Sequence, residues 1–229
     1  MIKKILFTLT AVLMLISIYL IFSSFSPIPV SLKEAPGDPI NFKIFYFHLP
    51  IAISAYLAFA IVFVSSVLYL RGKQQIWDIV ALSAAEVGVI FAFLTLVSGS
   101  IWARSAWGEY WVTWDVRLNT SLVLFLIYLS YLMVRQAVEE PEKRARLSAV
   151  FGIVGFVGVP ISYVSIRLWT RATLHPVAEL DYSTFSPLII TLFMNFAAFF
   201  LLAASLILIR MDNERLKEKG NELKRIKGL

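Results

Sequence analysis

Tryptophan is concentrated in one short segment of the chain, residues 102–117 (WARSAWGEYWVTWDVR). Four of the six Trp residues lie within these sixteen positions, interleaved with charged residues and one glycine. If the segment is helical, Trp107, Trp111 and Trp114 fall at i, i+4 and i+7 and share one face. Such an indole surface suits a large, flat, apolar ligand with polar edges. The alternative is an aromatic belt, because Trp and Tyr collect at membrane interfaces.

The chain has only two His, His48 in YFHLP and His175 in TLHP, and it has no Cys. Two neutral imidazoles from different segments can bind the opposite faces of one planar iron macrocycle. A zinc site would need a third or fourth protein ligand, and none is obvious. The lack of Cys excludes disulfides, thiolate nucleophiles and iron–sulfur clusters. The residues alone leave metal ligation and an incidental interfacial position both open for the His pair.

Composition indicates where these residues can lie. Of the 229 residues, 59% are hydrophobic and 16% charged, and the mean hydropathy is +0.78. These values are typical of an integral membrane protein. A helix needs roughly 20 apolar residues to cross a hydrocarbon core of about 30 Å. The sequence predicts six such helices, at 5–25, 44–70, 78–101, 118–136, 147–168 and 187–210.

We therefore expect an all-α integral membrane protein that forms one six-span domain over residues 1–229. No Gly-rich phosphate loop, low-complexity run or Pro- or Ser-rich linker divides the chain. The first span begins with Lys3 and Lys4, as a signal sequence would. Its apolar core is long enough to cross a membrane, however, and we expect it to be retained as a helix.

Charges in the loops orient the spans. Fifteen of the 21 Lys and Arg residues fall on the side that holds both termini, and six fall on the other. Because positive residues gather in the cytoplasm, both termini are predicted to be cytoplasmic. The net charge of +6 thus reflects membrane topology, and nucleic acid is not an expected partner. The basic tail, 211–229, is expected to be a solvated helix of alternating charge.

This orientation puts the Trp-rich segment and both His on the outer face of the membrane. The segment is expected to form a short amphipathic helix that lies flat, with Glu109 and Thr113 turned toward water. For Trp102 and Trp169, each at the end of a span, the aromatic belt and the ligand surface both remain open.

The sequence resembles a known family at these positions. WGEYWVTWD (107–115) matches the W-G-x-x-W-x-W-D signature of the haem-handling protein family, in which one His precedes and one follows the signature in outward-facing segments. The size and six spans are most similar to its short branch, the haem exporter protein C family of system I cytochrome c maturation. The resemblance runs from FKIFYFHLP to TLHP and covers nearly the whole chain.

The resemblance implies that the protein binds haem b and holds it at the exterior face of the plasma (inner) membrane. His48 and His175 would be the axial ligands of the haem iron, and Arg117 a partner for a haem propionate. The platform implied by the signature consists of Trp107, Gly108, Trp111, Trp114 and Asp115. Pro176 after the second His, and Arg171 four residues before it, depart from the commonest family pattern and leave the geometry of that loop open.

The family also implies partners. Its members work with ATP-binding cassette transporter subunits and pass haem to a membrane-anchored chaperone, which bonds covalently to a haem vinyl through its own His. This chain has no nucleotide site, so any ATP hydrolysis belongs to a partner and the chain is expected to be a delivery subunit rather than an enzyme.

Two other functions remain as alternatives. A b-type cytochrome usually pairs its His deep inside facing helices, whereas these two lie near the surface. A haem-translocating transporter would show broken helices and a polar lining, which the spans are expected to lack. No Ser–His–Asp arrangement supports hydrolysis.

Polar residues inside the spans carry weaker signals. Glu86 in the third span is a functional-site candidate because of its depth, but a hydrogen bond to a neighbouring helix near Gly88 is the preferred interpretation. Asn195 in the sixth span is expected to join helices in the same way. The SGS run at 98–100 is expected to allow close helix packing.

Overall fold

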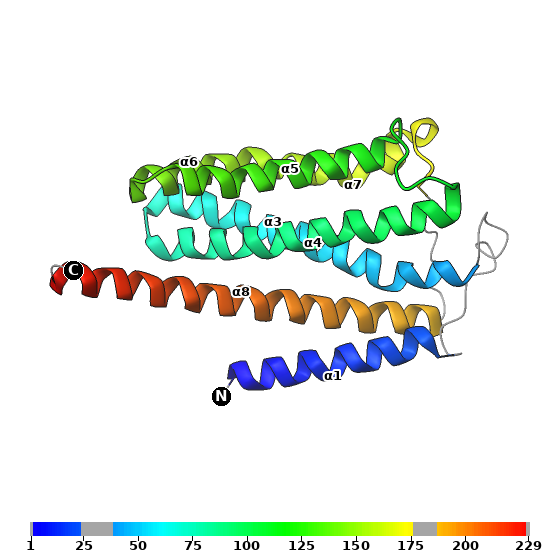
Figure 1. Ribbon diagram of the computed structural model, residues 1–229, viewed down its shortest axis with the longest axis horizontal. Coiled ribbons are helices and arrows are strands. Elements are labelled where there is room, and N and C mark those ends of the chain that lie inside the picture. Colours follow the sequence, from blue (N-terminus) through cyan, green and yellow to red (C-terminus); the bar gives the residue numbers. More distant parts are fainter. Residues whose placement is uncertain (1, 24–38, 176–186, 228–229) are drawn as a thin grey trace.

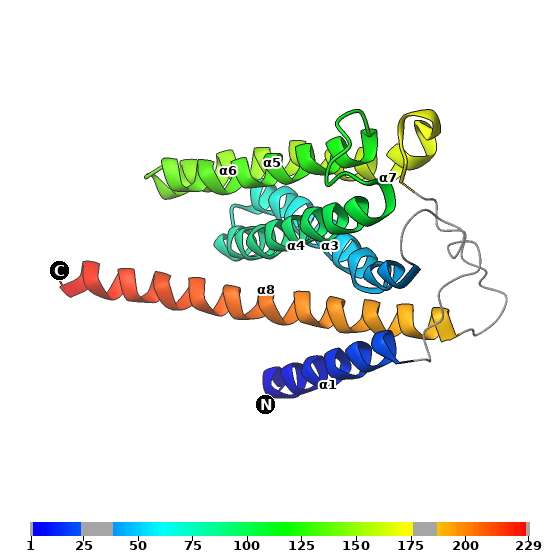
Figure 2. The ribbon, with the colours of Figure 1, turned by 45° about the vertical axis from the view of Figure 1, so that its right-hand side comes forward.

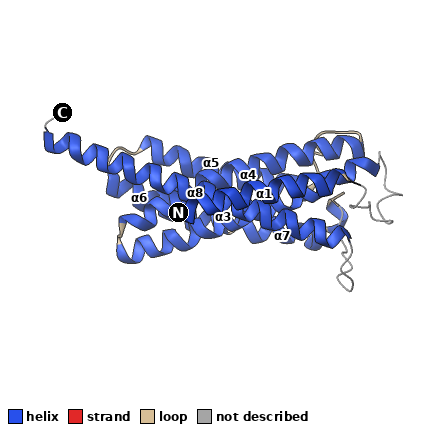
Figure 3. Ribbon diagram, turned by 90° about the horizontal axis from the view of Figure 1, so that it is seen from below, coloured by secondary structure: helices blue, strands red, loops and turns tan. Residues whose placement is uncertain are grey.

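The computed structural model describes residues 2–23, 39–175 and 187–227, and in these ranges it contains helices and no strand (Figure 3). The α-helices are α1 (Ile2–Phe22), α3 (Phe45–Gly72), α4 (Gln75–Trp107), α5 (Val116–Ala137), α6 (Pro141–Phe156), α7 (Gly158–Leu168) and α8 (Pro187–Lys227). Two 3-10 helices are η1 (Pro39–Ile44) and η2 (Thr170–Ala172). Pro176 lies outside the described residues, so the geometry of the loop after His175, which the sequence left open, stays open.

Six stretches of the described residues are long and apolar enough to cross a membrane, which confirms the six predicted spans. The helices extend beyond the apolar runs because charged and aromatic residues continue them at their ends. For example, α4 runs from Gln75 to Trp107, whereas its predicted apolar run covers 78–101. The chain is therefore a multi-pass all-α membrane protein.

The fifth span consists of two helices. α6 ends at Phe156 and α7 begins at Gly158, with only Val157 between them. Pro160 explains the break, because it has no N–H to donate to the Phe156 carbonyl and its ring crowds that group. The expectation that no span is broken is wrong here. However, Val157 keeps right-handed helical angles (φ −57°, ψ −31°), so the span is kinked rather than unwound.

The spans pack in layers around the hairpin of α3 and α4 (Figures 1 and 2). α5, α6 and α7 lie on one side of this hairpin, and α8 followed by α1 lies on the other. Phe59 of α3 is fully buried and stacks on Tyr128 of α5, with ring centroids 3.6 Å apart. Gly88 of α4 leaves room for this ring, because a Cβ there would come within 2.6 Å of Phe59. The α3–α4 contact is therefore close enough to require glycine.

The two ends of the bundle differ in what they carry (Figure 1). Both termini lie at one end, together with the α3–α4 and α5–α6 connections, and we call it the terminal end. Residues 108–115, which connect α4 to α5, lie at the other end, which we call the Trp end. Because the chain crosses the bundle an even number of times, the C-terminus returns to the end that holds the N-terminus.

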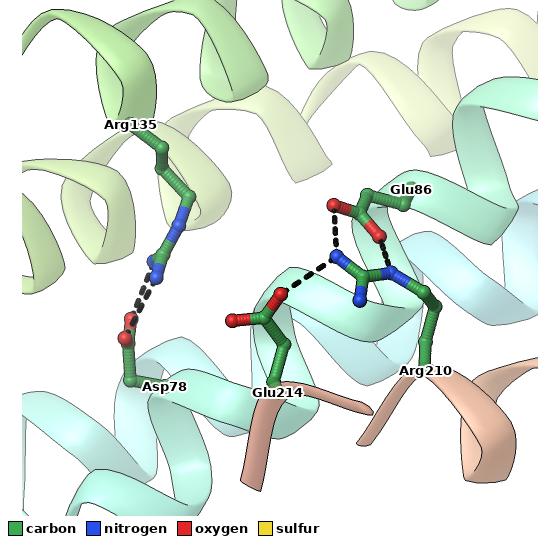
Figure 4. A network of polar contacts seen from close by, with 5 residues as sticks. All are labelled: Asp78, Glu86, Arg135, Arg210 and Glu214. Atoms are coloured by element: carbon green, nitrogen blue, oxygen red, sulfur yellow. Dashed lines mark hydrogen bonds and ion pairs between the residues drawn. The ribbon is translucent and has the colours of Figure 1, made fainter. Parts of the chain in front are cut away.

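Ion pairs join neighbouring helices of the bundle (Figure 4). Arg135 of α5 and Asp78 of α4 form a bidentate pair at 2.5 and 2.8 Å, and both side chains are largely buried. Arg210 of α8 pairs with Glu86 of α4 and, at 2.8 Å, with Glu214 of its own helix. Glu86 thus ties α4 to α8, which agrees with a structural role for this carboxylate.

The last helix, α8, is continuous over 41 residues. It includes the basic tail as far as Lys227, so the predicted tail helix is confirmed over that range. Asn195, in the apolar part of α8, is buried and donates to the Thr191 carbonyl of the same helix at 2.8 Å. This hydrogen bond lies within one helix, contrary to the expected role in joining two.

Candidate functional site

The Trp-rich segment is a turn and not the predicted amphipathic helix. α4 continues through Trp107 and ends at Gly108, whose left-handed backbone (φ 81°) lets its N–H donate to the Arg104 carbonyl at 3.1 Å. Glycine adopts this conformation without strain, so it ends the helix here. α5 begins at Val116. The helix expected over 107–115 is therefore wrong, because the chain must reverse between two spans within this segment.

Asp115 connects this turn to the segment that carries the second His. Its side chain is fully buried, and its Oδ1 caps α5 by accepting from the Leu118 N–H at 3.0 Å. Its Oδ2 accepts from Thr173 Oγ1 at 2.9 Å and from the Leu174 N–H at 2.7 Å. Thr173 Oγ1 in turn accepts from the His175 N–H at 3.1 Å. One carboxylate thus fixes both the start of α5 and the backbone before His175.

His48 and His175 line one cavity at the Trp end, with ring centroids 6.5 Å apart and ring planes tilted by 34°. A metal ion bonded to one nitrogen of each ring at about 2 Å, with each nitrogen about 1 Å from its centroid, would separate the centroids by about 6 Å. The observed spacing therefore suits two ligands on opposite sides of one metal centre. His48 Nδ1 also lies 2.8 Å from Ser98 Oγ of α4.

Aromatic side chains form much of the cavity wall. Trp102, Trp107 and Trp111 line it, and the Trp102 ring centroid lies 6.4 Å from that of His175 and 5.2 Å from that of Trp107. The position of Trp102 favours the ligand surface over the aromatic belt. Apolar residues of η1, α3 and α4 complete the wall.

The signature residues differ in where their side chains lie. Trp107 and Trp111 face the cavity, whereas Trp114 is 56% exposed and lies outside its lining. Gly108 and Asp115 shape the turn and its neighbours and do not line the cavity either. The signature therefore combines residues that form a wall with residues that hold the backbone in place.

Arg117, in the first turn of α5, puts a cation at the cavity. Its guanidinium donates to the Ser162 carbonyl of α7, and its Cζ lies 5.9 Å from the Tyr56 ring centroid. Among the described residues no carboxylate forms an ion pair with it, in contrast to Arg135 and Arg210. An anionic group of a ligand would therefore meet a guanidinium that no carboxylate of the described residues neutralises.

The sequence predictions missed one residue beside the His pair, Ser98. The sequence predicts only helix packing for the SGS run, whereas Ser98 contacts the His48 ring. A signal was present, because Ser98 and Trp102 are four residues apart on one helix and therefore share a face.

The donor set of the site favours a planar metal macrocycle over an ion held by protein ligands alone. In the described parts of the chain, no group of three or more His, Asp or Glu side chains could hold a metal. Two imidazoles, indole walls and one cation that has no ion pair among the described residues match a flat apolar ligand that has a metal centre and acidic substituents. The fold and the site thus define a class: a multi-span helical membrane protein with paired His in a Trp-lined cavity at one end.

The chain belongs to the heme exporter protein C family, whose sequence profile matches residues 1–226. Heme exporter protein C of Bradyrhizobium diazoefficiens is 35% identical over 189 residues, which cover 79% of this chain and 69% of that protein. The protein of the same name from Escherichia coli K12 is 31% identical over 178 residues, covering 76% and 70%. A mitochondrial ccmC-like protein of Marchantia polymorpha, named provisionally for cytochrome c biosynthesis, is 34% identical over 179 residues, covering 76% and 75%. The chain is thus a haem-handling membrane protein by family.

Proposed function

We propose that the protein is a subunit of the cytochrome c maturation machinery that binds haem b in the cavity at the Trp end and presents it to a membrane-anchored haem chaperone. The observation that carries this proposal is the His48–His175 pair, whose ring centroids lie 6.5 Å apart in a Trp-lined cavity. Haem would supply an iron with two axial positions and a flat, apolar ring.

Each site residue has a role in this proposal. His48 and His175 would hold the haem iron, and Trp107 and Trp111 would contact the flat porphyrin ring. Arg117 pairs with a propionate, since guanidinium binds carboxylate through two parallel hydrogen bonds. The remaining three signature residues act around the ligand. Gly108 and Asp115 set the turn and the His175 segment, and Trp114 presents an exposed indole at the rim, where a partner docks.

The proposed orientation puts the Trp end at the exterior or periplasmic face of the plasma (inner) membrane and both termini in the cytoplasm. It is supported by the excess of Lys and Arg in the segments that the fold gathers at the terminal end. ATP-binding cassette transporter subunits of the maturation complex are the proposed partners that hydrolyse ATP. This chain then receives and delivers haem and catalyses no reaction itself.

Absorption spectroscopy of the detergent-purified protein tests the ligation. We expect haem to bind at one per chain with the spectrum of a low-spin, six-coordinate iron. His48→Ala and His175→Ala should each shift the bound haem toward a high-spin spectrum, because each removes one axial bond. Glu109→Gln is the matched control, since Glu109 is exposed and lies outside the cavity lining.

Transfer of haem separates delivery from electron transport. When loaded protein is mixed with the purified haem chaperone, haem should move to the chaperone and become covalently bound there. A protein that keeps its haem and is instead reduced by quinol would be a b-type cytochrome. A wild-type protein that takes up no haem under any of these conditions would overturn the proposal.

A further inference from the structure

Ser98 of α4 contacts the ring of His48 across the interface between α3 and α4. The distance from Ser98 Oγ to His48 Nδ1 is 2.8 Å, which is a hydrogen bond whichever atom carries the proton. The two residues belong to different spans, so this bond fixes the imidazole relative to a second helix. Ser98 has no other role in the site described above.

The other hydrogen bonds of Ser98 decide the direction of this one. Ser98 Oγ lies 2.8 Å from the Leu94 carbonyl and 3.3 Å from the Thr95 carbonyl of its own helix. Carbonyl oxygens only accept, and a hydroxyl has one proton, so Ser98 donates that proton to the backbone. Toward His48 it can then act only as an acceptor. With the Ser98 proton on the backbone, the 2.8 Å contact places the hydrogen on His48 Nδ1.

We infer that Ser98 is a positioning residue that holds His48 as its Nδ1–H tautomer and so keeps the Nε2 lone pair available to iron. The role of this hydrogen bond toward iron rests on the proposed function, whereas the hydrogen bond itself does not. Ligating His side chains usually donate their other ring N–H to a neighbouring acceptor, which sets the tautomer and the ring orientation and makes the ligand more basic.

Gly99 supports the same interpretation from the next position along α4. A Cβ at Gly99 would lie 3.1 Å from His48 Cε1 and 3.9 Å from each ring nitrogen. The ring therefore packs against the backbone of α4 at Gly99 while it bonds to Ser98. Two consecutive residues define the place of one imidazole: Ser98 provides the acceptor and Gly99 provides the space.

The tautomer can be read directly in the haem-free protein. Because the chain has only two His, labelling with ¹⁵N-histidine gives nitrogen signals from two side chains, and His175→Gln assigns them. At a pH where both rings are neutral, we expect protonated Nδ1 and bare Nε2 for His48. Ser98→Ala should give a mixture of tautomers, whereas Ser98→Thr, which keeps the hydroxyl, should restore the wild-type pattern. Ser130→Ala is the matched control, since Ser130 donates to the carbonyl four residues earlier in its helix, as Ser98 does, but lies outside the cavity lining.

Haem loading gives a second measurement. Loss of a hydrogen-bonding neighbour of a metal ligand typically weakens the metal site by about 10–100-fold, so Ser98→Ala should lower haem affinity by about tenfold or more. It should also raise the midpoint potential of bound haem, because a less basic imidazole stabilises the ferric state less. Ser98→Thr and Ser130→Ala should leave both quantities near the wild-type values.

The outcomes separate this inference from the proposed function. If wild-type His48 carries its proton on Nε2, or if Ser98→Ala changes neither the tautomer nor the haem properties, the inference is wrong and haem binding still stands. If the wild-type protein takes up no haem while His48 shows the Nδ1–H form that Ser98→Ala disturbs, the hydrogen bond is as inferred and the proposed function is wrong.

Discussion

At the scale of single residues, the tryptophans of the signature have unequal surroundings. Trp111 lines the cavity, whereas Trp114 is 56% exposed. A buried aromatic contact contributes on the order of 1–3 kcal/mol, and we expect Trp111→Ala to weaken haem binding by that amount. Trp114→Ala should change haem affinity by less than about twofold, because an exposed ring loses little contact with the ligand. Haem titrations followed by absorbance measure both values.

Trp114 provides the internal comparison for this prediction, since both variants remove one indole from the same turn. Trp114→Ala should leave haem binding intact but slow the transfer of haem to the chaperone. Equal losses of haem affinity in the two variants would show that the turn has a different arrangement in the loaded protein.

Asp115 is expected to act through His175 rather than through contact with haem. Asp115→Asn keeps an oxygen to cap α5, since Asn caps helices as well as Asp does. It replaces the other acceptor by an NH₂ group, which faces the Leu174 N–H without a hydrogen bond. We expect Asp115→Asn to fold with α5 intact but to show part of the high-spin haem signal of His175→Ala, as measured by absorption or electron paramagnetic resonance.

Asn119→Ala is the control for Asp115→Asn. Asn119 donates to the Thr113 carbonyl at 2.7 Å, within the same turn, and makes no described bond to the His175 segment. It should leave the haem spectrum unchanged. A fully low-spin spectrum for Asp115→Asn would mean that the His175 segment is held by other contacts.

At the scale of helices, glycine permits a close contact between two spans, α3 and α4. A Cβ at Gly88 would lie 2.6 Å from the buried ring of Phe59, and overpacking of this kind costs about 1–3 kcal/mol. We expect Gly88→Ala to lower the thermal unfolding midpoint in detergent. Gly220→Ala, where nothing lies within 4 Å of the added Cβ, should be neutral or stabilise α8 by up to about 1 kcal/mol. If Gly88→Ala unfolds at the wild-type temperature, the α3–α4 contact is looser than described.

The helices could be predicted from the sequence where they depend on residues close together in the chain. Apolar runs identify spans because crossing a bilayer depends on length and composition alone. The kink at Val157 was also within reach, because Pro160 removes a hydrogen bond four residues earlier in the chain. The prediction of a helix over 107–115 was wrong because a helical spacing of Trp residues does not indicate where the chain reverses. Gly108 and Asp115, an end signal and a start signal for helices, were the better indicators.

At the scale of the whole molecule, the even number of crossings predicts the position of each connection. A reporter that is active only in the cytoplasm should work when it is fused after Lys73 or after Leu229, and it should be inactive when it is fused after Glu109. A reporter active only outside should give the reverse pattern. An exterior C-terminus would invert the proposed orientation and move the Trp end to the cytoplasm.

The candidate site depends on contacts that no local pattern predicts. Pairing of His48 with His175 was a hypothesis because only two His are present, yet their separation of 6.5 Å required the packed helices. The bonds from Asp115 to Thr173 and Leu174 join residues 58 and 59 positions apart. Sequence alone indicated that Asp115 belongs to the signature, but it gave no reason to connect it with the segment before His175.

The same bonds set an order of events during biosynthesis. When Asp115 leaves the ribosome, the partners of its Oδ2 lie 58 and 59 residues downstream and have not yet been translated. At about 5–20 residues per second, roughly 3–12 s pass before they emerge. During that interval the carboxylate is capped on one oxygen only and stays hydrated. The hydrogen bonds from Asp115 to Thr173 and Leu174 therefore cannot form until the kinked fifth span has been made, which delays completion of the cavity until nearly the last helix is being inserted.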